Sequence, residues 1–226
     1  MALGFDARVV ASLPQLLDGL TVTLVLTLAG ATGSMLFGHL ALLMQINNHR
    51  LLRGLARLYI SFMRGTPALV QLFMLFFALP LVGLGGRPML SAILALGLNS
   101  GAYTAEILRA NLLVVSAGQV EAAAALGMSR WRIWRRISLP QILTASLPAL
   151  VNEFTILLKT TPLASVVAVT DLTYAGQLVI TRTFASTQVL MLVSVGYLAV
   201  ALPVIFYARR LESTLSAQRN VRALRP

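Results

Sequence analysis

Several polar side chains stand inside long apolar stretches of this sequence. Glu153 lies within PALVNEFTILL, and Asn99, Tyr103 and Glu106 recur at i, i+4 and i+7, with Ser100 beside them. That spacing places the three on one face of a helix. A carboxylate, amide or hydroxyl in apolar surroundings is costly unless it meets a partner, so these positions are candidates for binding a polar or charged solute.

The composition indicates where these side chains must work. Of the 226 residues, 58% are hydrophobic and 11% are charged, and the mean hydropathy is +0.82. An ordinary soluble domain carries about 25% charged residues. We therefore expect the chain to lie in a lipid bilayer, where polar groups must find their partners inside the protein or on a solute.

Five apolar segments have the length, or nearly the length, of a membrane-spanning helix, which takes about 20 residues. They cover residues 16–44, 67–84, 89–112, 141–158 and 188–208. The segment 160–187 is interrupted by Pro162 and Gly176, so a broken or re-entrant helix is expected there. The predicted fold is an all-α integral membrane protein, residues 1–226 forming one domain.

The basic residues are concentrated at a few places along the chain. In a soluble protein, the formal net charge of +11 would suggest a nucleic-acid partner. Here most of the charge falls in three short windows, about 50–64, 130–136 and 209–225. Arginine and lysine collect on the cytoplasmic side of membrane proteins. With five crossings, the windows predict an N-terminus outside, a C-terminus in the cytoplasm, and no nucleic-acid partner.

Several kinds of chemistry lack the residues they need. The chain has no cysteine, and its two histidines, His39 and His49, are ten positions apart, so no metal site is expected. Gly-x-Ser-x-Gly and His-Glu-x-x-His patterns are absent. The only lysine, Lys159, follows TILL rather than a glycine-rich turn, so no P-loop is present. We expect no enzymatic activity and no cofactor, and any energy must come from another subunit.

The stretch EAAAALGMSRWRIWRRISLP, residues 121–140, separates the third and fourth predicted spans. Its alanines predict a helix beginning near Glu121, which Gly127 ends in a left-handed conformation. Ser129 predicts a cap for a second short helix, residues 130–137, lying at the membrane surface. Because alanines have little bulk to bury, we interpret the first helix as a docking element for a cytosolic partner. An alanine-rich loop helix without such a role is the alternative.

A motif in this stretch resembles the EAA loop of bacterial ABC-importer permeases. Its residues are Glu121, Ala122, Ala123, Gly127, Leu139 and Pro140. Three further stretches are similar to the polar amino acid (histidine/lysine/arginine/ornithine-type) uptake branch of that family. They are YISFMRGTPALVQLFMLFFALP (59–80), LGLNSGAYTAEILRANL (96–112) and LPALVNEFTILLKTTPLASV (147–166).

The resemblance implies a five-helix permease core with a cytoplasmic coupling loop, about residues 116–140, in the bacterial inner membrane. It also implies partners: a pair of ATPase subunits that bind the ATP, a second permease that is either the same chain or a paralogue, and an extracytoplasmic solute-binding protein. The residues of the EAA motif would couple the permease to ATP hydrolysis. The transported solute would be a polar amino acid.

Under this resemblance, polar residues of the third and fourth spans become the expected substrate-binding residues. They are Glu153, Asn99, Tyr103, Ser100 and Lys159. Glu153 favours a cationic amino acid such as arginine, lysine, histidine or ornithine. An opine or another small amine is the alternative substrate, and a structural subunit of another membrane complex is the alternative from a different class.

The same residues also have purely structural interpretations. Glu153 could form a buried ion pair with Lys159 or with an arginine of a second permease. The polar stripe of the third span could simply hold helices together. The chain also departs from the family pattern: where the family commonly reads Lys-Asp-Thr-Ser, residues 159–162 read Lys-Thr-Thr-Pro.

Overall fold

A computed structural model describes residues 6–223, and every regular element within them is a helix. In chain order they are α1 (Ala7–Ala11), α2 (Leu13–Gln45), α3 (Arg50–Gly65), α4 (Ala68–Ala78), η1 (Leu79–Val82), α5 (Pro88–Ala110), η2 (Leu112–Val114), α6 (Ala117–Ala125), α7 (Arg130–Ile133), η3 (Trp134–Ser138), α8 (Leu139–Thr160), η4 (Thr161–Val167), α9 (Leu172–Thr183) and α10 (Ser186–Ala223).

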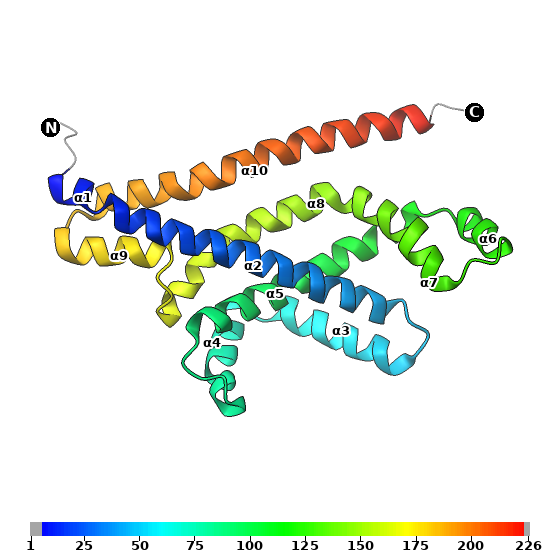
Figure 1. Cartoon of the computed structure of the whole chain (residues 1–226), viewed down its shortest axis with the longest axis horizontal. Coiled ribbons are helices and arrows are strands. Elements are labelled where there is room, and N and C mark those ends of the chain that lie inside the picture. The colour runs from blue at the N-terminus through cyan, green and yellow to red at the C-terminus, as the bar shows by residue number, and fades with distance from the viewer. Residues whose placement is uncertain (1–5, 224–226) are drawn as a thin grey trace.

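The long helices α2, α5, α8 and α10 form the body of the molecule (Figure 1). The α2–α3 connection, α6, α7 and the last turns of α10 lie at one end of it, while α1 and α9 lie at the other (Figure 1). The three basic windows therefore begin or fall at a common end of the bundle. This arrangement agrees with the predicted topology, in which all three windows share one side of the membrane.

Helices α2 and α5 pack against each other more extensively than any other pair. Glycines line their contact: a Cβ added to Gly33 would lie 3.4 Å from the Cα of Gly97. A Cβ on Gly38 would lie 2.6 Å from the Thr104 methyl group and 2.9 Å from the carbonyl oxygen of Gly101. Small residues let helix backbones approach closely in a bilayer, where the solvent gives no hydrophobic drive for helices to associate.

Three helices of the described chain are long and apolar enough to cross a membrane: α2, the continuous helix Arg130–Val167, and Ser186–Ala208 of α10. A fourth span results only if α3 and the α4–η1 segment count as one helix bent by 113°. The 23 residues of α5 are also enough to span. Its polar residues lower its hydropathy below that of the other spans. A bilayer tolerates these residues because α5 is largely surrounded by α2, α4 and α8.

Two predicted features differ from the structure. The segment 67–84 is not one straight span, since α4 has only 11 residues, about 16 Å of helix, before the 3₁₀ turn η1. Residues 130–137 do not form a separate surface helix, because α7, the π turn η3 and α8 run on as one helix. The wide π turn directly precedes Pro140, which lets the helix pass a residue that lacks an N–H.

The chain is interrupted between residues 160 and 187, but not at the two residues expected to break it: the helix continues past Pro162 to Val167, and Gly176 lies within α9. After α8 the chain forms the 3₁₀ segment η4, passes Ala168 at a positive φ of 60°, and re-enters helix at Leu172. Asp171 caps α9 by accepting a hydrogen bond from the backbone N–H of Tyr174 at 2.9 Å. A second bond, from the hydroxyl of Tyr197 to the same carboxylate, ties α10 to this cap.

The close approach of α2 and α5 generates a first prediction. Gly38→Ala should lower the stability of the detergent-purified protein by about 1–3 kcal/mol, because its Cβ would overlap Thr104 and the Gly101 carbonyl. Gly54→Ala on α3 is the matched control, since nothing lies within 4 Å of the added Cβ. Thermal unfolding monitored by circular dichroism measures both. Equal melting temperatures for the two variants would contradict the glycine contact.

Candidate functional site

Glu153 is buried in the bundle, with 8% of its surface exposed. It sits on α8 and accepts a hydrogen bond of 2.7 Å from the hydroxyl of Ser100 on α5. Ser100 accepts in turn from Ser34 on α2 at 3.1 Å, and Ser34 lies 2.8 Å from the hydroxyl of Thr104. These four buried side chains connect three helices.

The hydroxyl protons in this cluster have a single consistent order. Each hydroxyl has one proton to donate. Because Ser100 donates to Glu153 and Ser34 donates to Ser100, the bond between Thr104 and Ser34 must be donated by Thr104. The chain of donors therefore ends at the carboxylate of Glu153, which is the final acceptor. The arrangement leaves capacity at Glu153 for a further donor from a solute.

Asn99 is also brought into a polar network, but on the other side of α5. Its amide nitrogen donates to the side-chain oxygen of Gln71 at 3.0 Å and to the carbonyl of Met63 at 3.3 Å. Gln71 is 2% exposed, and its amide nitrogen donates to the hydroxyl of Thr66 at 2.8 Å. Asn99 thereby fastens α5 to the sharp junction between α3 and α4.

Tyr103 and Glu106 continue this face of α5 toward α3. The guanidinium of Arg64 lies 5.4 Å from the centre of the Tyr103 ring and 3.7 Å from Glu106. Glu106 also accepts from Arg109 at 2.9 Å and from Gln45 at 3.2 Å. The predicted stripe of Asn99, Tyr103 and Glu106 therefore lies on one face of α5, toward α3, whereas Ser100 beside it turns to Glu153.

Lys159 is exposed in the last turn of α8 and forms no ion pair with any residue that the structure describes. The alternative of a buried Glu153–Lys159 pair is therefore wrong within this chain. Lys159 also does not join Ser100 and Glu153, so the residues expected to bind substrate do not form one cluster.

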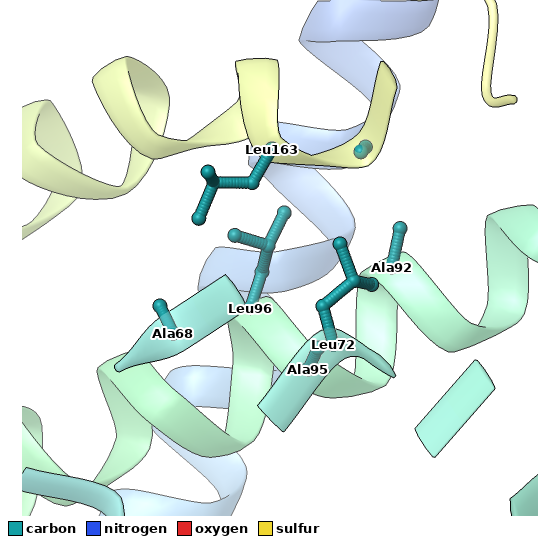
Figure 2. Close-up of a pocket in the computed structure, with 7 residues that line it drawn as sticks. Ala68, Leu72, Ala92, Ala95, Leu96 and Leu163 are labelled. Atoms are coloured by element: carbon teal, nitrogen blue, oxygen red, sulfur yellow. The ribbon is translucent and has the colours of Figure 1, made fainter. Parts of the chain in front are cut away.

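A small cavity lies where α4, α5 and η4 meet (Figure 2). The side chains of Leu72, Leu96 and Leu163 converge on it with several alanines (Figure 2). Its volume of about 10 Å³ is the room of about one water molecule. The cavity is apolar and too small for an amino acid, so we interpret it as a packing gap beside the junction that Asn99 and Gln71 hold.

The EAA motif forms a helix and turn much as the sequence predicts. Gly127 has a φ of 77°, its N–H donates to the carbonyl of Ala124, and the N–H of Met128 donates to that of Ala123. This pattern is a Schellman C-cap. Ser129 then accepts from the N–H of Arg132 at 3.4 Å and caps α7.

The predicted surface of α6 needs correction at two positions. The helix begins at Ala117, so Glu121 lies in its second turn and not in the first. Ala123 is 4% exposed and packs against its own chain, so it does not present itself to a partner. Glu121 and Ala122 are exposed, and so is Leu126, with 83% of its surface accessible.

The coupling loop is joined firmly to α8. The side-chain nitrogen of Gln141 donates to the side-chain oxygen of Gln119 on α6 at 2.8 Å. Leu139 and Pro140 form the first turn of α8, which continues to Glu153 without a break. Trp131 is 62% exposed, whereas Trp134 packs against the ring of His39 with centroids 5.9 Å apart. The two tryptophans therefore differ in exposure, one facing outward and the other packed against α2.

Residues 34–216 match the family described as the binding-protein-dependent transport system inner membrane component. The chain belongs to this family. The permease is 36% identical over 203 residues to the glutamine transport system permease protein GlnP of Escherichia coli (strain K12), covering 89% of this chain and 93% of that protein. It is 34% identical over 200 residues to the nopaline transport system permease protein NocM of Agrobacterium fabrum (strain C58 / ATCC 33970), covering 84% and 83%.

Among solved structures, a chain in the crystal structure of an amino acid ABC transporter with histidines superposes on the permease. The TM-score is 0.82 at 32% identity, over 95% of this chain and 100% of that one. The predicted family and all-α permease fold are thereby confirmed. The permease is a membrane subunit of the amino acid ABC importer type, and it is not itself an enzyme. An importer of this type implies a separate ATPase and a solute-binding protein as partners.

Sequence reasoning missed two members of the polar networks in the permease. Ser34 lies in the first predicted span, and a serine at that position does not indicate that its hydroxyl would form a hydrogen bond with Ser100 on another helix. Gln71 lies one turn into α4, where a buried amide flanked by apolar residues could have been singled out as Asn99 was. The high exposure of Leu126, at the end of the alanine helix, was also not predicted.

The left-handed turn after α6 generates a second prediction. Gly127→Ala should destabilise the coupling loop by about 1 kcal/mol, because a Cβ is unfavourable at positive φ. Trypsin should then cleave after Arg130 about fivefold faster in the detergent-solubilised permease. Gly118→Ala, inside α6, is the control and should slow cleavage, because alanine favours helix. Cleavage of the Gly127 variant at the wild-type rate would show that the turn imposes no such conformation.

Proposed function

We propose that this permease imports a cationic amino acid and that Glu153 receives the positive group of the substrate. The observation that carries the proposal is the setting of Glu153. It is a buried carboxylate whose protein partner is a neutral serine hydroxyl, and no described cation lies within ion-pair distance of it. A carboxylate left uncompensated in a membrane protein is costly, and a cationic substrate would remove that cost.

The sequence relatives support a polar amino acid without fixing its charge. The protein from Escherichia coli is named for glutamine and the protein from Agrobacterium for nopaline. Glu153 would meet the α-ammonium of a neutral amino acid as readily as it would meet a cationic side chain. An opine therefore stands as the second candidate substrate, because a relative named for one aligns with most of the chain.

We assign different tasks to the other predicted site residues. Ser100 orients the carboxylate of Glu153 and takes part in the site directly. Asn99 and Tyr103 hold the α3–α4 junction against α5, so they affect the site indirectly, by fixing the helix that carries Ser100. Lys159, exposed and unpaired within the described chain, is positioned to attract the carboxylate of the substrate or to face a second permease.

We further propose that α6 docks on the ATPase through its exposed residues. The exposed residues of α6 and of its C-cap are small apart from Gln119, Glu121 and Leu126, so a partner surface can approach the alanine face closely beside one projecting leucine. Motion of α6 would pass through the Gln119–Gln141 bond and the continuous helix into α8, which carries Glu153. In the inner membrane this mechanism places the coupling loop and the C-terminus in the cytoplasm and the N-terminus outside.

The role of Glu153 is tested by Glu153→Gln in the reconstituted transporter with its ATPase and binding protein. We expect the concentration of arginine or lysine that half-saturates ATP hydrolysis to rise at least about tenfold, because a charge-assisted hydrogen bond contributes about 1.5–3 kcal/mol. Asp18→Asn, an equal change at an exposed carboxylate of α2, is the control. Unchanged stimulation by arginine, lysine, histidine and ornithine in the Glu153 variant would sink the proposal.

The docking of α6 is tested by placing bulk on its exposed face. Ala122→Trp should prevent co-purification of the ATPase while the permease remains monodisperse, because Ala122 is exposed and its replacement disturbs no internal contact. Ala11→Trp, at an exposed position at the opposite end of the bundle, should leave co-purification unchanged. Retention of the ATPase by the Ala122 variant would show that this face of α6 does not dock.

A further inference from the structure

A wide groove lies beside the coupling loop, on the side away from α6. It is formed by Leu43 and residues 46–49 of the α2–α3 connection on one wall, and by Arg130, Trp131 and Trp134 on the other. We name it the arginine–tryptophan groove. Its volume is about 590 Å³, large enough for a ligand of moderate size. A second hollow of about 250 Å³ continues from it past Trp131 to Arg132, Arg135 and Arg136.

The charge around this groove is not balanced by the protein. Four arginines lie within residues 130–136, and neither hollow has a carboxylate in its wall. Over the described residues, ion pairs form at Arg8, Arg64 and Arg109, and none involves these four. Like charges so close together repel, so an anion at the groove would stabilise them.

The groove also offers hydrogen-bond donors that have no acceptor. The indole nitrogen of Trp134, a residue that lines the groove, is buried without a partner. His49, the N-cap of α3, makes no side-chain cap bond, so the first N–H groups of this helix have no acceptor from it. Donors of these kinds suit a phosphate oxygen.

The rest of the lining distinguishes a lipid from a soluble anion. Leu43 and Ile46 are the last apolar residues of a membrane-spanning helix, and they form one wall. Trp131, 62% exposed, stands between the two hollows. A site that places aliphatic side chains and tryptophan beside guanidinium groups at the end of a span matches the boundary between acyl chains and headgroups.

We propose that the arginine–tryptophan groove binds the headgroup of an anionic phospholipid. The phosphate would lie against Arg130 and the indole of Trp134, and the acyl chains would leave along Leu43. Such a lipid would join the α2–α3 connection to α7, next to the coupling loop. The proposal goes beyond substrate recognition and does not depend on what Glu153 binds.

The tryptophans provide a direct test, because the chain has only two and both line the groove. The full-length permease is reconstituted in phosphatidylcholine vesicles containing equal mole fractions of brominated phosphatidylglycerol or brominated phosphatidylcholine. Bromine quenches tryptophan fluorescence on contact. We expect the phosphatidylglycerol to quench more strongly, with a relative binding constant several-fold above one.

Arg130→Gln should reduce this preference about fivefold, since one basic residue contributes about 1 kcal/mol of attraction to an anionic lipid surface. Arg130→Lys should give an intermediate value, because lysine keeps the positive charge but lacks the planar guanidinium group that can donate two parallel hydrogen bonds to a phosphate. Arg87→Gln, exposed between η1 and α5, should leave the preference unchanged. Far-ultraviolet circular dichroism confirms that each variant is folded.

Four results would overturn the proposal. Equal quenching by the two lipids would mean that the groove has no lipid preference, and an unaltered preference in Arg130→Gln would place the lipid elsewhere. Selective loss of the preference in inorganic phosphate, compared with chloride of equal ionic strength, would assign the groove to a soluble anion. If adding a tryptophan-free ATPase abolishes quenching by both lipids, the groove belongs to the ATPase interface instead.

Discussion

The contact between α2 and α5 is the constraint on which the polar interior depends. Lipid gives helices no hydrophobic reason to associate, so their pairing rests on close backbone packing and internal hydrogen bonds. Glycines at positions 33, 38, 97 and 101 remove the side chains that would hold the two backbones apart. Only at this separation does Ser34 reach both Ser100 and Thr104. The orientation of Ser100 toward Glu153 on α8 therefore depends on how closely α2 packs against α5.

A second feature connects Glu153 to the coupling loop through one helix. The helix from Arg130 to Val167 has no loop within it, although it changes from α to π and then to 3₁₀ geometry. A movement imposed near Ser129 is therefore carried along the helix toward Glu153. Pro148 lies between the two and removes a backbone hydrogen bond from the middle of α8, so any bending is easiest at that point.

The sequence predicted the helices well where local chemistry decides their ends. Gly127 and Ser129 fixed the coupling loop because a positive φ and a capping hydroxyl act within a few residues. The predictions failed where the structure is determined by more than the few residues around a helix end. The sequence did not predict the π turn at Trp134–Ser138, through which the helix passes on to Pro140 and its missing N–H. The break between α3 and α4 has a local cause in Pro67, which holds Thr66 in extended backbone, but the 113° angle is held by Gln71 and Asn99 on different helices, so no local pattern reveals it.

The sequence singled out Glu153, on which the candidate site is centred, but it did not predict which residues would lie around it. Glu153 stood out because a carboxylate in an apolar run has few explanations. Ser100 was expected to bind the same substrate as Asn99 and Tyr103, but it lies beside their face of the helix, since consecutive residues point about 100° apart. Ser100 therefore turns to α8, while its neighbours turn to α3.

The burial of Glu153 limits how a substrate can reach it. With 8% of the residue exposed, the carboxylate meets a solute only if one of its surrounding helices moves. Helix α5 is held to α2 by glycine contacts and to α3 by Asn99, so displacing it would break several interactions together. Helix α8 meets α5 and α2 through the Ser100–Glu153 hydrogen bond and through apolar packing of Ile142 with Leu42 and Leu108, and it is continuous with the coupling loop. Under the proposed mechanism α8 is therefore the helix that moves, so opening of the site and displacement of the loop are the same event.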